Sequence, residues 1–324
     1  MKREEPFVSV LTPFYNTAEY LAECIESVLK QDHENYEYIL VDNLSTDGGA
    51  AIVEKYAGQD SRIRLVRADR FRAQIENYNY ALQFASPASR YIKLAQADDT
   101  LSEDHLSRLV KIAEEHPEVG LLSSYDVRGE RVYGRGLPVD REVFSGREAA
   151  RAFFLNWVFP FGSPTTVLYR GDVVRARTPF FPEALHADTE VIFEILRNHA
   201  FGFAHDVLSF TRLREESISG KRNALEAGLL DRLILVRRFG RHYLDEAEYD
   251  ICSGEVEGMY YRTLGRRWLK ELGGTSSEEF WAFHRDGLAT IGERIVWCRV
   301  AAAIGRIVTD NLLHPREESR AHGA

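Results

Sequence analysis

Two adjacent carboxylates, Asp98 and Asp99, are the residues whose types and spacing most directly suggest chemistry. They follow a short apolar run, residues 91–95, which predicts a buried strand, and they precede a helical pattern over residues 105–113. Open α/β sheets bind ligands at the carboxyl ends of their strands. Because two like charges so close together are costly without a shared cation, the pair predicts a divalent metal held with phosphate oxygens. An ordinary acidic turn before a helix is the alternative interpretation.

The composition is that of a globular chain able to bury a full core. The sequence has 324 residues, of which 44% are hydrophobic and 28% are charged. Its net charge of -9 argues against a general nucleic-acid binder, which would carry a basic surface. No apolar run reaches the ~18 residues of a membrane-spanning helix, so no such helix is expected.

The cysteines point to a compartment rather than to a site. Cys24, Cys252 and Cys298 are odd in number, far apart and without metal-ligand spacing. This pattern favours a reducing, cytoplasmic setting over a disulfide framework. Cys24 and Cys298 lie in apolar helical patterns, and we expect both to be small core residues.

The elements that must position the two acids follow from the hydrophobic periodicity. Apolar runs that predict strands alternate with helical patterns, which predicts an α/β fold with a doubly wound, mostly parallel sheet. The ends of strands at Tyr15, Asp42 and Asp98 should then meet in one crevice. No Gly-x-Gly-x-x-Gly motif follows the first strand, which disfavours a dinucleotide site. The first expected strands are residues 7–12, 38–41, 63–66, 91–95 and 119–122.

The pattern changes in the second half of the chain. A turn and strand are expected at 162–170, an acidic loop before a helix at 191–198, and short strands at 201–204 and 207–212. Long helical patterns then cover 225–243, 249–272 and 278–313. We therefore predict a domain of residues 1–220 and a helical region of residues 221–324, ending in a disordered tail from residue 314.

Taken in order, these pieces resemble a family 2 glycosyltransferase with the glycosyltransferase A fold, a Rossmann-like, mostly parallel sheet with helices on both faces. The resemblance covers about residues 7–220 and rests on several motifs rather than one. The matching segments are Val8 to Asn16, Asp42 to Gly48, Asn77 to Leu82 followed by Tyr91 to Asp99, His186 to Asp188, and Thr211 to Ser219.

The resemblance implies a nucleotide site at the first strands. Pro13 and Tyr15 would line the base, with Asp42 as the neighbouring carboxylate. Asn43 stands where the family has an acid that pairs with uracil, and an amide both accepts and donates hydrogen bonds. The resemblance implies a uridine nucleotide, and the amide at position 43 leaves another base as the alternative. The resemblance also implies that Asn79 contacts the nucleotide sugar.

At the metal motif, Gln96 replaces an acid that is frequent in the family, while Asp98 and Asp99 remain. The resemblance implies that one of them holds Mn²⁺ or Mg²⁺ against the diphosphate. We favour Asp99 as the metal ligand and Asp98 as a donor contact. The metal would neutralise charge on the departing nucleoside diphosphate, so no general acid is needed.

The resemblance further implies one catalytic base on the acceptor side. Asp188 is the candidate, with Glu190 as the fallback; the alternative is that both acids simply begin a helix. Arg212 and Arg214 would contact the diphosphate, because arginine can fork onto phosphate. Relatives often have histidine at position 214, which puts a histidine in the metal shell in doubt here. His186 is interpreted as a surface residue, and Trp157 as a core residue that could stack on a sugar.

The implied function is an inverting, metal-dependent transfer from a nucleotide-sugar, most plainly a UDP-sugar, to a glycan, lipid-linked or small-molecule acceptor. The setting is cytoplasmic, with the inner membrane face as an option. The C-terminal helices would shape the acceptor site, form a homodimer, touch a membrane surface or serve as a packing appendage. The rival functions are a sugar nucleotidyltransferase and a nucleotide-sugar-binding protein without turnover, the latter motivated by Asn43, Gln96 and Arg214.

Overall fold

The computed structural model describes residues 5–184, 186–213, 222, 224–272 and 277–313. The chain divides into two compact units, Met1–Leu213 and Arg214–Ala324. The predicted boundary near residue 220 and the predicted tail from residue 314 both lie outside the described residues.

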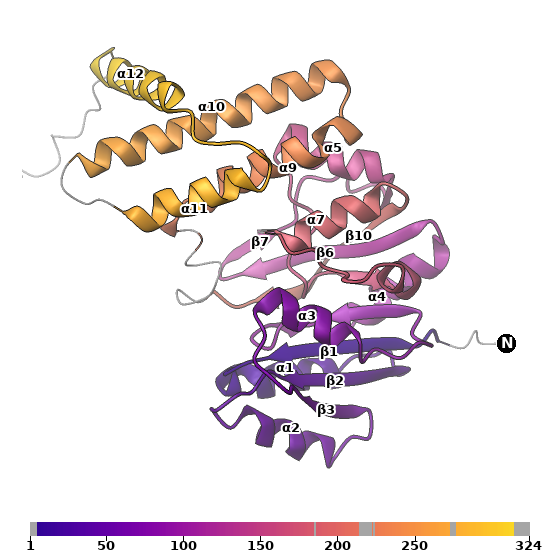
Figure 1. Ribbon diagram of the computed structural model, residues 1–324. Coiled ribbons are helices and arrows are strands. Elements are labelled where there is room, and N and C mark those ends of the chain that lie inside the picture. The colour runs from indigo at the N-terminus through magenta and orange to yellow at the C-terminus, as the bar shows by residue number, and fades with distance from the viewer. Residues whose placement is uncertain (1–4, 185, 214–221, 223, 273–276, 314–324) are drawn as a thin grey trace, which may run out of the picture. The chain divides into compact units, whose positions relative to one another are not determined.

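The first unit is built around one sheet. Its strand order is β3-β2-β1-β4-β9-β6-β10-β5, with β7 paired to β6 and β8 paired to β10 (Figure 1). The strands are β1 (Val8–Phe14), β2 (Tyr36–Asp42), β3 (Ile63–Arg67), β4 (Tyr91–Leu94), β5 (Thr100–Leu101), β6 (Val119–Arg128), β7 (Arg131–Tyr133), β8 (Val143–Phe144), β9 (Leu168–Arg170) and β10 (Ala200–Thr211).

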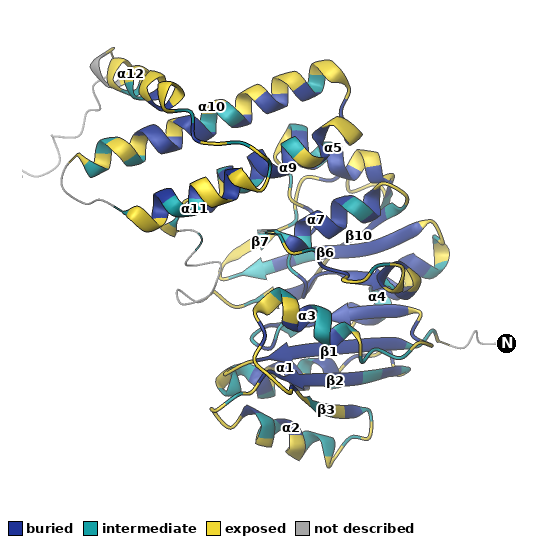
Figure 2. Cartoon of the chain, in the orientation of Figure 1, coloured by how far each residue is buried: buried dark blue, intermediate teal, exposed yellow. Residues whose placement is uncertain are grey.

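Helices connect most of these strands, as the alternating sequence pattern predicts. They are α1 (Ala18–Leu29), α2 (Gly49–Ala57), α3 (Gln74–Leu82), α4 (His105–Glu115), α5 (Gly146–Asn156), α6 (Gly171–Arg175) and α7 (Ala187–Leu196). Every residue of β1 is buried, and Figure 2 shows the central strands in the buried colour. A strand buried without alternation is covered on both faces, which is the property of a doubly wound sheet.

The sheet is mixed rather than parallel throughout. β3, β2, β1 and β4 pair in parallel, and so do β6 and β10. β9 lies between β4 and β6 and is antiparallel to both. Because β9 runs against β4, the segment that enters β9 lies beside the segment that leaves β4. The predicted α/β fold is confirmed, and the antiparallel β9 is a detail that the periodicity did not reveal.

Two expected boundaries were wrong. Residues 201–204 and 207–212, expected as two strands, belong to the single strand β10, whose register shifts between Ala204 and Val207. A bulge of this kind interrupts the alternation in sequence without ending the strand. Residues 278–313, expected as one helix, form α11 (Glu278–Ala289) and α12 (Trp297–Leu313). Gly292, at φ +70°, takes a left-handed conformation between them, where glycine has no steric cost.

The second unit is helical in its described part. It contains α9 (Ala227–Tyr243), α10 (Glu246–Glu271), α11 and α12. Asp245 and Glu248 form a capping box that starts α10. Among the described residues, no helix combines the length and apolar character needed to cross a membrane. Cys24 is buried as expected, whereas Cys298 is exposed, so its assignment to the core was wrong.

Candidate active site

The carboxyl ends of three neighbouring strands bring the first predicted residues to one edge of the sheet. β2, β1 and β4 are adjacent and parallel. Asp42 is the last residue of β2, Tyr15 follows β1, and Asp98 follows β4 after a short turn. Because parallel strands end at the same edge, these side chains share the position at which α/β sheets bind ligands.

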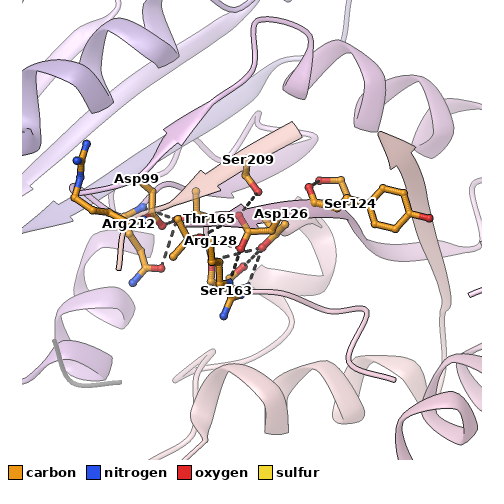
Figure 3. A network of polar contacts seen from close by, with 12 residues as sticks. Asp99, Ser124, Asp126, Arg128, Ser163, Thr165, Ser209 and Arg212 are labelled. Atoms are coloured by element: carbon orange, nitrogen blue, oxygen red, sulfur yellow. Dashed lines mark hydrogen bonds and ion pairs between the residues drawn. The ribbon is translucent and has the colours of Figure 1, made fainter. Parts of the chain in front are cut away.

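Asp99 is buried at this edge and is held by two segments distant in sequence. Its Oδ2 accepts a hydrogen bond from the Thr165 hydroxyl at 2.6 Å, and its Oδ1 accepts one from the backbone N–H of Arg212 at 3.0 Å (Figure 3). Burial raises the pKa of Asp99 to about 7, and the charge of Asp98 adds to the rise, against the lowering effect of these hydrogen bonds. Asp99 therefore fixes the two segments that meet it.

A buried lysine also holds the segment that precedes β9. Lys93 of β4 is fully buried, and its ammonium donates to the backbone carbonyls of Thr165 and Val167. Burial lowers the pKa of Lys93 well below its usual value, although the nearby charges of Asp99 and Asp126 act in the opposite direction. The segment before β9 is thus tied to β4 twice, through Lys93 and through Asp99.

A second buried acid lies in the same network. Asp126, near the end of β6, accepts hydrogen bonds from Ser209 and Thr211 of β10 and from the guanidinium of Arg128 (Figure 3). These contacts hold the end of β10 against β6. Arg212 directly follows β10, so Asp126 and Asp99 together determine where the chain leaves the sheet. Sequence reasoning did not single out Asp126, because a lone aspartate in an apolar strand gives no spacing pattern.

Asp98 differs from its neighbour in exposure. Asp98 is partly exposed, while Asp99 is only 3% exposed. The backbone carbonyl of Asp98 accepts a hydrogen bond from Nε of Arg212 at 3.2 Å. The Arg212 guanidinium also pairs with Glu23 and lies 4.6 Å from the centre of the Tyr20 ring. Arg212 is therefore beside the acidic motif, its contact with a diphosphate stays a prediction, and Arg214 lies outside the described residues.

The site predicted for the nucleotide base contains an exposed aromatic pair. Tyr15 is 45% exposed and packs edge-on against Phe71, which is 54% exposed, with ring centres 4.9 Å apart. Sequence reasoning missed Phe71, although an aromatic between two arginines just after the third strand could have suggested it. Pro13 is buried within β1, and Asp42 is buried with its Oδ1 accepting from the backbone of Ser45 at 2.8 Å.

Asn43 binds protein backbone at this site. Its Oδ1 accepts from the backbone N–H of Arg72 at 3.0 Å, and its Nδ2 donates to the carbonyl of the same residue at 2.8 Å. The amide is also buried. One side chain thus satisfies both backbone groups of Arg72 and fixes the loop on which Phe71 stands.

Asn79 of α3 makes the same pair of bonds to a different loop. Its Nδ2 donates to the carbonyl of Phe181 at 2.9 Å, and its Oδ1 accepts from the N–H of Phe181 at 2.9 Å. Phe181 precedes α7, the helix whose first turn contains Asp188 and Glu190. The predicted contacts of Asn43 and Asn79 with a nucleotide sugar stay predictions, and in this structure both amides bind backbone.

Asp188 is the more accessible of the two acids at the start of α7. It is partly exposed and its Oδ1 accepts from the backbone N–H of Thr189 at 2.8 Å, whereas Glu190 is buried. The charges of Asp188 and Asp98 both add to the burial that raises the pKa of Tyr78. Tyr78 is therefore close enough to interact electrostatically with Asp188, the predicted catalytic base, and with Asp98 of the acidic motif.

Two further predicted residues lie on the surrounding elements. His186 directly precedes α7 and is partly exposed, which agrees with its interpretation as a residue at the surface. Trp157 ends α5 and is 48% exposed, so its assignment to the core was wrong. An exposed indole remains able to stack on a sugar face.

The donor set at the edge fits a hard divalent cation. Asp98 and Asp99 offer carboxylate oxygens, the ligands that Mg²⁺ and Mn²⁺ prefer. Within the described residues, no group of three or more His, Cys, Asp and Glu side chains could hold a metal ion by itself. Magnesium sites built from one or two carboxylates are usually completed by substrate phosphates, so the residues present fit a metal that binds together with a diphosphate.

Two hollows lie away from this edge. One of about 250 Å³ is lined by Arg90, Arg170 and Arg175, at the amino end of β4. The other, of about 600 Å³, is in the helical unit and is lined by residues that include Arg237 and Glu257. Neither contains a predicted site residue, so the candidate site is defined by its side chains rather than by an enclosed cavity.

Comparison with known proteins agrees with the sheet and the motifs. A model of the family described as "Glycosyl transferase family 2" matches residues 9–177. Among curated relatives, the glycosyltransferase GlyG of Streptococcus pneumoniae is 32% identical over 118 residues, 36% of this chain and 38% of that protein. The putative teichuronic acid biosynthesis glycosyltransferase TuaG of Bacillus subtilis is 31% identical over 143 residues, 44% of this chain and 54% of that protein. The matches thus span about half or less of these relatives.

Solved structures share the fold over nearly the whole chain. TarS 1-349 of S. aureus, in complex with UDP-GlcNAc, has a TM-score of 0.61 at 21% identity and covers 95% of this chain and 87% of its own. The mannosyltransferase PcManGT of Pyrobaculum calidifontis, in complex with GDP-Man and Mn²⁺, has a TM-score of 0.60 at 18% identity and covers 97% and 89%. At this level of identity the likeness shows the fold alone.

Proposed function

The chain belongs to glycosyl transferase family 2, and we propose that it moves a sugar from a UDP-sugar to an acceptor hydroxyl with inversion, using Asp188 as the general base. The observation that carries this proposal is the position of Tyr78, whose hydroxyl accepts from Nε2 of Gln96 in the acidic motif and whose ring contacts that of Phe181, which precedes α7. Burial raises the pKa of Tyr78, and the charges of Asp188 and Asp98 add to this rise, in agreement with an acid on each side of the tyrosine.

The proposed reaction needs one proton transfer at the protein. The acceptor oxygen attacks the anomeric carbon, and the Asp188 carboxylate takes the hydroxyl proton as the new C–O bond forms. The bond between the anomeric carbon and the diphosphate oxygen breaks, and its electron pair leaves with the nucleoside diphosphate. Asp188 is preferred to Glu190 because it is partly exposed, whereas Glu190 is buried.

The proposed donor site follows the sheet edge. The base would stack on the open pair Tyr15 and Phe71, since every base offers a flat face to an aromatic ring. The Arg212 guanidinium would contact the diphosphate. A divalent metal, when bound, would neutralise charge on the leaving diphosphate. We propose Asp98 as its ligand instead of Asp99, because Asp98 is the more exposed and both oxygens of Asp99 already accept hydrogen bonds.

The proposal also covers the donor, the acceptor and the cellular setting. A UDP-sugar is chosen because S. aureus TarS is known in complex with UDP-GlcNAc and with UDP, and GDP-Man is the comparison because PcManGT binds it. The acceptor is a glycan, a lipid-linked sugar or a small molecule. A cytoplasmic setting, including the inner membrane face, is proposed from the cysteine pattern of the sequence, because Cys24, Cys252 and Cys298 are odd in number and far apart.

The test is donor turnover with water or added sugars as acceptors. Release of UDP from UDP-GlcNAc, or of GDP from GDP-Man, is measured with Mn²⁺ in the parent and in Asp188→Asn. Loss of a general base lowers the rate by ~10²–10⁴-fold, while UDP affinity should be unchanged. An Asp188→Asn protein as active as the parent would refute the base assignment. Tight UDP binding without turnover of either donor would favour the rival function of a binding protein.

A metal titration tests the ligand assignment separately. Asp98→Asn should raise the Mn²⁺ concentration needed for half-maximal UDP binding at least tenfold, because a neutral amide replaces a charged oxygen ligand. Asp99→Asn should change that concentration less. The reverse order of the two variants would return the ligand to Asp99, the original prediction.

A further inference from the structure

Helix α3 contacts both sides of the proposed active site through consecutive residues. Asn79 pairs with both backbone groups of Phe181, each hydrogen bond being 2.9 Å long. Two bonds of this geometry fix the position and also the orientation of the Phe181 peptide relative to α3. The contact joins residues 102 positions apart in the sequence.

Phe181 cannot move independently of its surroundings. Its side chain is 0% exposed, and its ring contacts the rings of Tyr78 at 5.9 Å and Tyr169 at 6.4 Å between centres. Phe181 precedes α7, which begins at Ala187 with Asp188 in its first turn. Phe181 is therefore anchored by backbone bonds to Asn79 and by packing between two tyrosines.

Tyr78 reaches the opposite side of the site. Its hydroxyl accepts from Nε2 of Gln96 at 3.1 Å, and Gln96 belongs to the acidic motif. The backbone N–H of Gln96 donates to the Thr165 hydroxyl oxygen at 3.1 Å, and that hydroxyl donates to Asp99 at 2.6 Å. A continuous series of hydrogen bonds thus runs from α3 through Gln96 and Thr165 to the buried acid.

The residue at position 96 suits this contact chemically. The side-chain amide of Gln96 donates to the phenol oxygen of Tyr78, while the Thr165 hydroxyl, whose one proton goes to Asp99, accepts from the backbone N–H of Gln96. An ionised aspartate at this position could accept from the phenol O–H of Tyr78 but could not donate to it. The amide of Gln96 thus makes the Tyr78 hydroxyl the acceptor of this hydrogen bond.

We propose that Tyr78 and Asn79 are positioning residues that set the separation between the acidic motif, Asp98 and Asp99, and the predicted base Asp188. The inference rests on the proposed function, because it gives Asp188 the role of base. Neither residue needs to touch the substrate. A rigid helix carrying both contacts keeps the acceptor oxygen and the leaving group in line, and a misplacement of 1 Å at such a site can cost ~10²-fold in rate.

The first experiment compares Asn79→Ala and Asn79→Asp with the parent. Asn79→Ala removes both bonds to Phe181 and should lower kcat by ~10²-fold, with the donor KM and the UDP affinity within twofold of the parent. Asn79→Asp keeps an acceptor for the Phe181 N–H but loses the donor, and should fall between the two. The split between kcat and KM is the readout that a merely structural residue would not give.

A matched control is available at the opposite edge of the sheet. Asn35 also uses its amide to bind backbone, donating to the carbonyl of Glu5 at 2.6 Å just before β2. Asn35→Ala should leave kcat and KM at parental values. Tyr78→Phe, which keeps the ring and deletes the hydroxyl that receives Gln96, should lower kcat about tenfold even if Asn79→Ala proves too unstable to assay.

The outcomes separate this inference from the function on which it rests. If Asp188→Asn is inactive while Asn79→Ala and Tyr78→Phe keep kcat within threefold of the parent, the positioning role is wrong and the base assignment stands. If Asn79→Ala raises KM and weakens UDP binding with kcat unchanged, Asn79 is a donor contact and the inference is overturned. If Asp188→Asn is fully active, the proposed function itself fails.

Discussion

Two asparagine clamps in the first unit use the same chemistry for different ends. Asn43 pairs with the backbone of Arg72 through bonds of 3.0 and 2.8 Å, and Asn79 pairs with that of Phe181 through two bonds of 2.9 Å. Each fixes a loop segment that carries a phenylalanine. Phe71, beside Arg72, is 54% exposed, whereas Phe181 is 0% exposed.

The difference between the clamps shows what each loop is for. A buried aromatic stabilises the fold through its packing, while an exposed aromatic held rigidly costs stability and is available to a ligand. The clamp at Asn43 therefore presents a surface, and the clamp at Asn79 builds a support. Both amides were expected to contact the nucleotide sugar, and in this structure both bind the backbone of a loop instead.

The largest expected effect is on the free energy of unfolding, and it distinguishes Phe181 from Phe71. Phe181→Ala should destabilise the protein by about 3–5 kcal/mol, because it leaves a cavity between Tyr78 and Tyr169. Urea unfolding followed by circular dichroism measures this change. A loss below 1 kcal/mol would mean that the loop repacks, and the contrast between a supporting and a presenting clamp would disappear.

The next effect compares the clamps themselves. Asn43→Ala and Asn79→Ala each delete two hydrogen bonds to backbone groups, and each should cost about 1–3 kcal/mol of unfolding free energy. Similar stability losses should accompany different functional losses: weaker UDP binding for Asn43→Ala and lower kcat for Asn79→Ala. Isothermal titration with UDP and steady-state kinetics measure the two. If both variants lose affinity alike, the two loops are not separate functional parts.

A pH series tests Asp99, the buried acid that binds Thr165 and Arg212. Burial raises the pKa of Asp99 to about 7, above the ~3.9 of an unfolded aspartate. The folded protein then keeps a proton that the unfolded chain has lost, so stability falls as the pH rises through this window. Between pH 5 and 7 the metal-free protein should lose about 2 kcal/mol from this group alone.

The control for the pH series is Asp99→Asn, which has no proton to lose. Its unfolding free energy should fall less over the same range than that of the parent, whereas Asn43→Ala and Asn79→Ala should keep the parental slope. Equal slopes in the parent and Asp99→Asn would mean that Asp99 is ionised throughout. Mn²⁺ with UDP should flatten the parental slope, because a bound cation favours the carboxylate.

The sequence predicted the sheet because its information is local. Apolar runs at β1, β2, β3 and β4 have the length and flanking turns of strands, and parallel strands deliver Asp42 and Asp98 to a common edge by geometry alone. The antiparallel β9 was not predictable, because strand direction depends on where a distant segment enters the sheet. The break between α11 and α12 escaped because apolar residues continue across Gly292.

The residue types of the site could be predicted from the sequence, whereas the partners of several of these residues could not. Spacing identified Asp98 and Asp99, since acids at a strand end form a pattern, whereas Asp188 was predicted from the resemblance to the family. The partners of Asn43 and Asn79 lie 29 and 102 residues away, and no periodicity links an amide to a backbone at that distance. Phe71 was missed because its one signal, an aromatic between two arginines, is weak in an exposed polar loop.

The smallest expected effect is on Phe71, and it distinguishes presentation from packing most directly. Because the side chain is 54% exposed, Phe71→Ala should change the unfolding free energy by less than about 0.5 kcal/mol. Loss of one stacking face should weaken UDP binding by about 1–2 kcal/mol, an affinity about 5–30-fold lower. Tyr15→Ala should behave alike, and the double variant should lose less than the sum, because the rings share one partner. If Phe71→Ala binds UDP like the parent, the nucleotide base does not stack on Tyr15 and Phe71. The Asn43 clamp would then have no role in UDP binding.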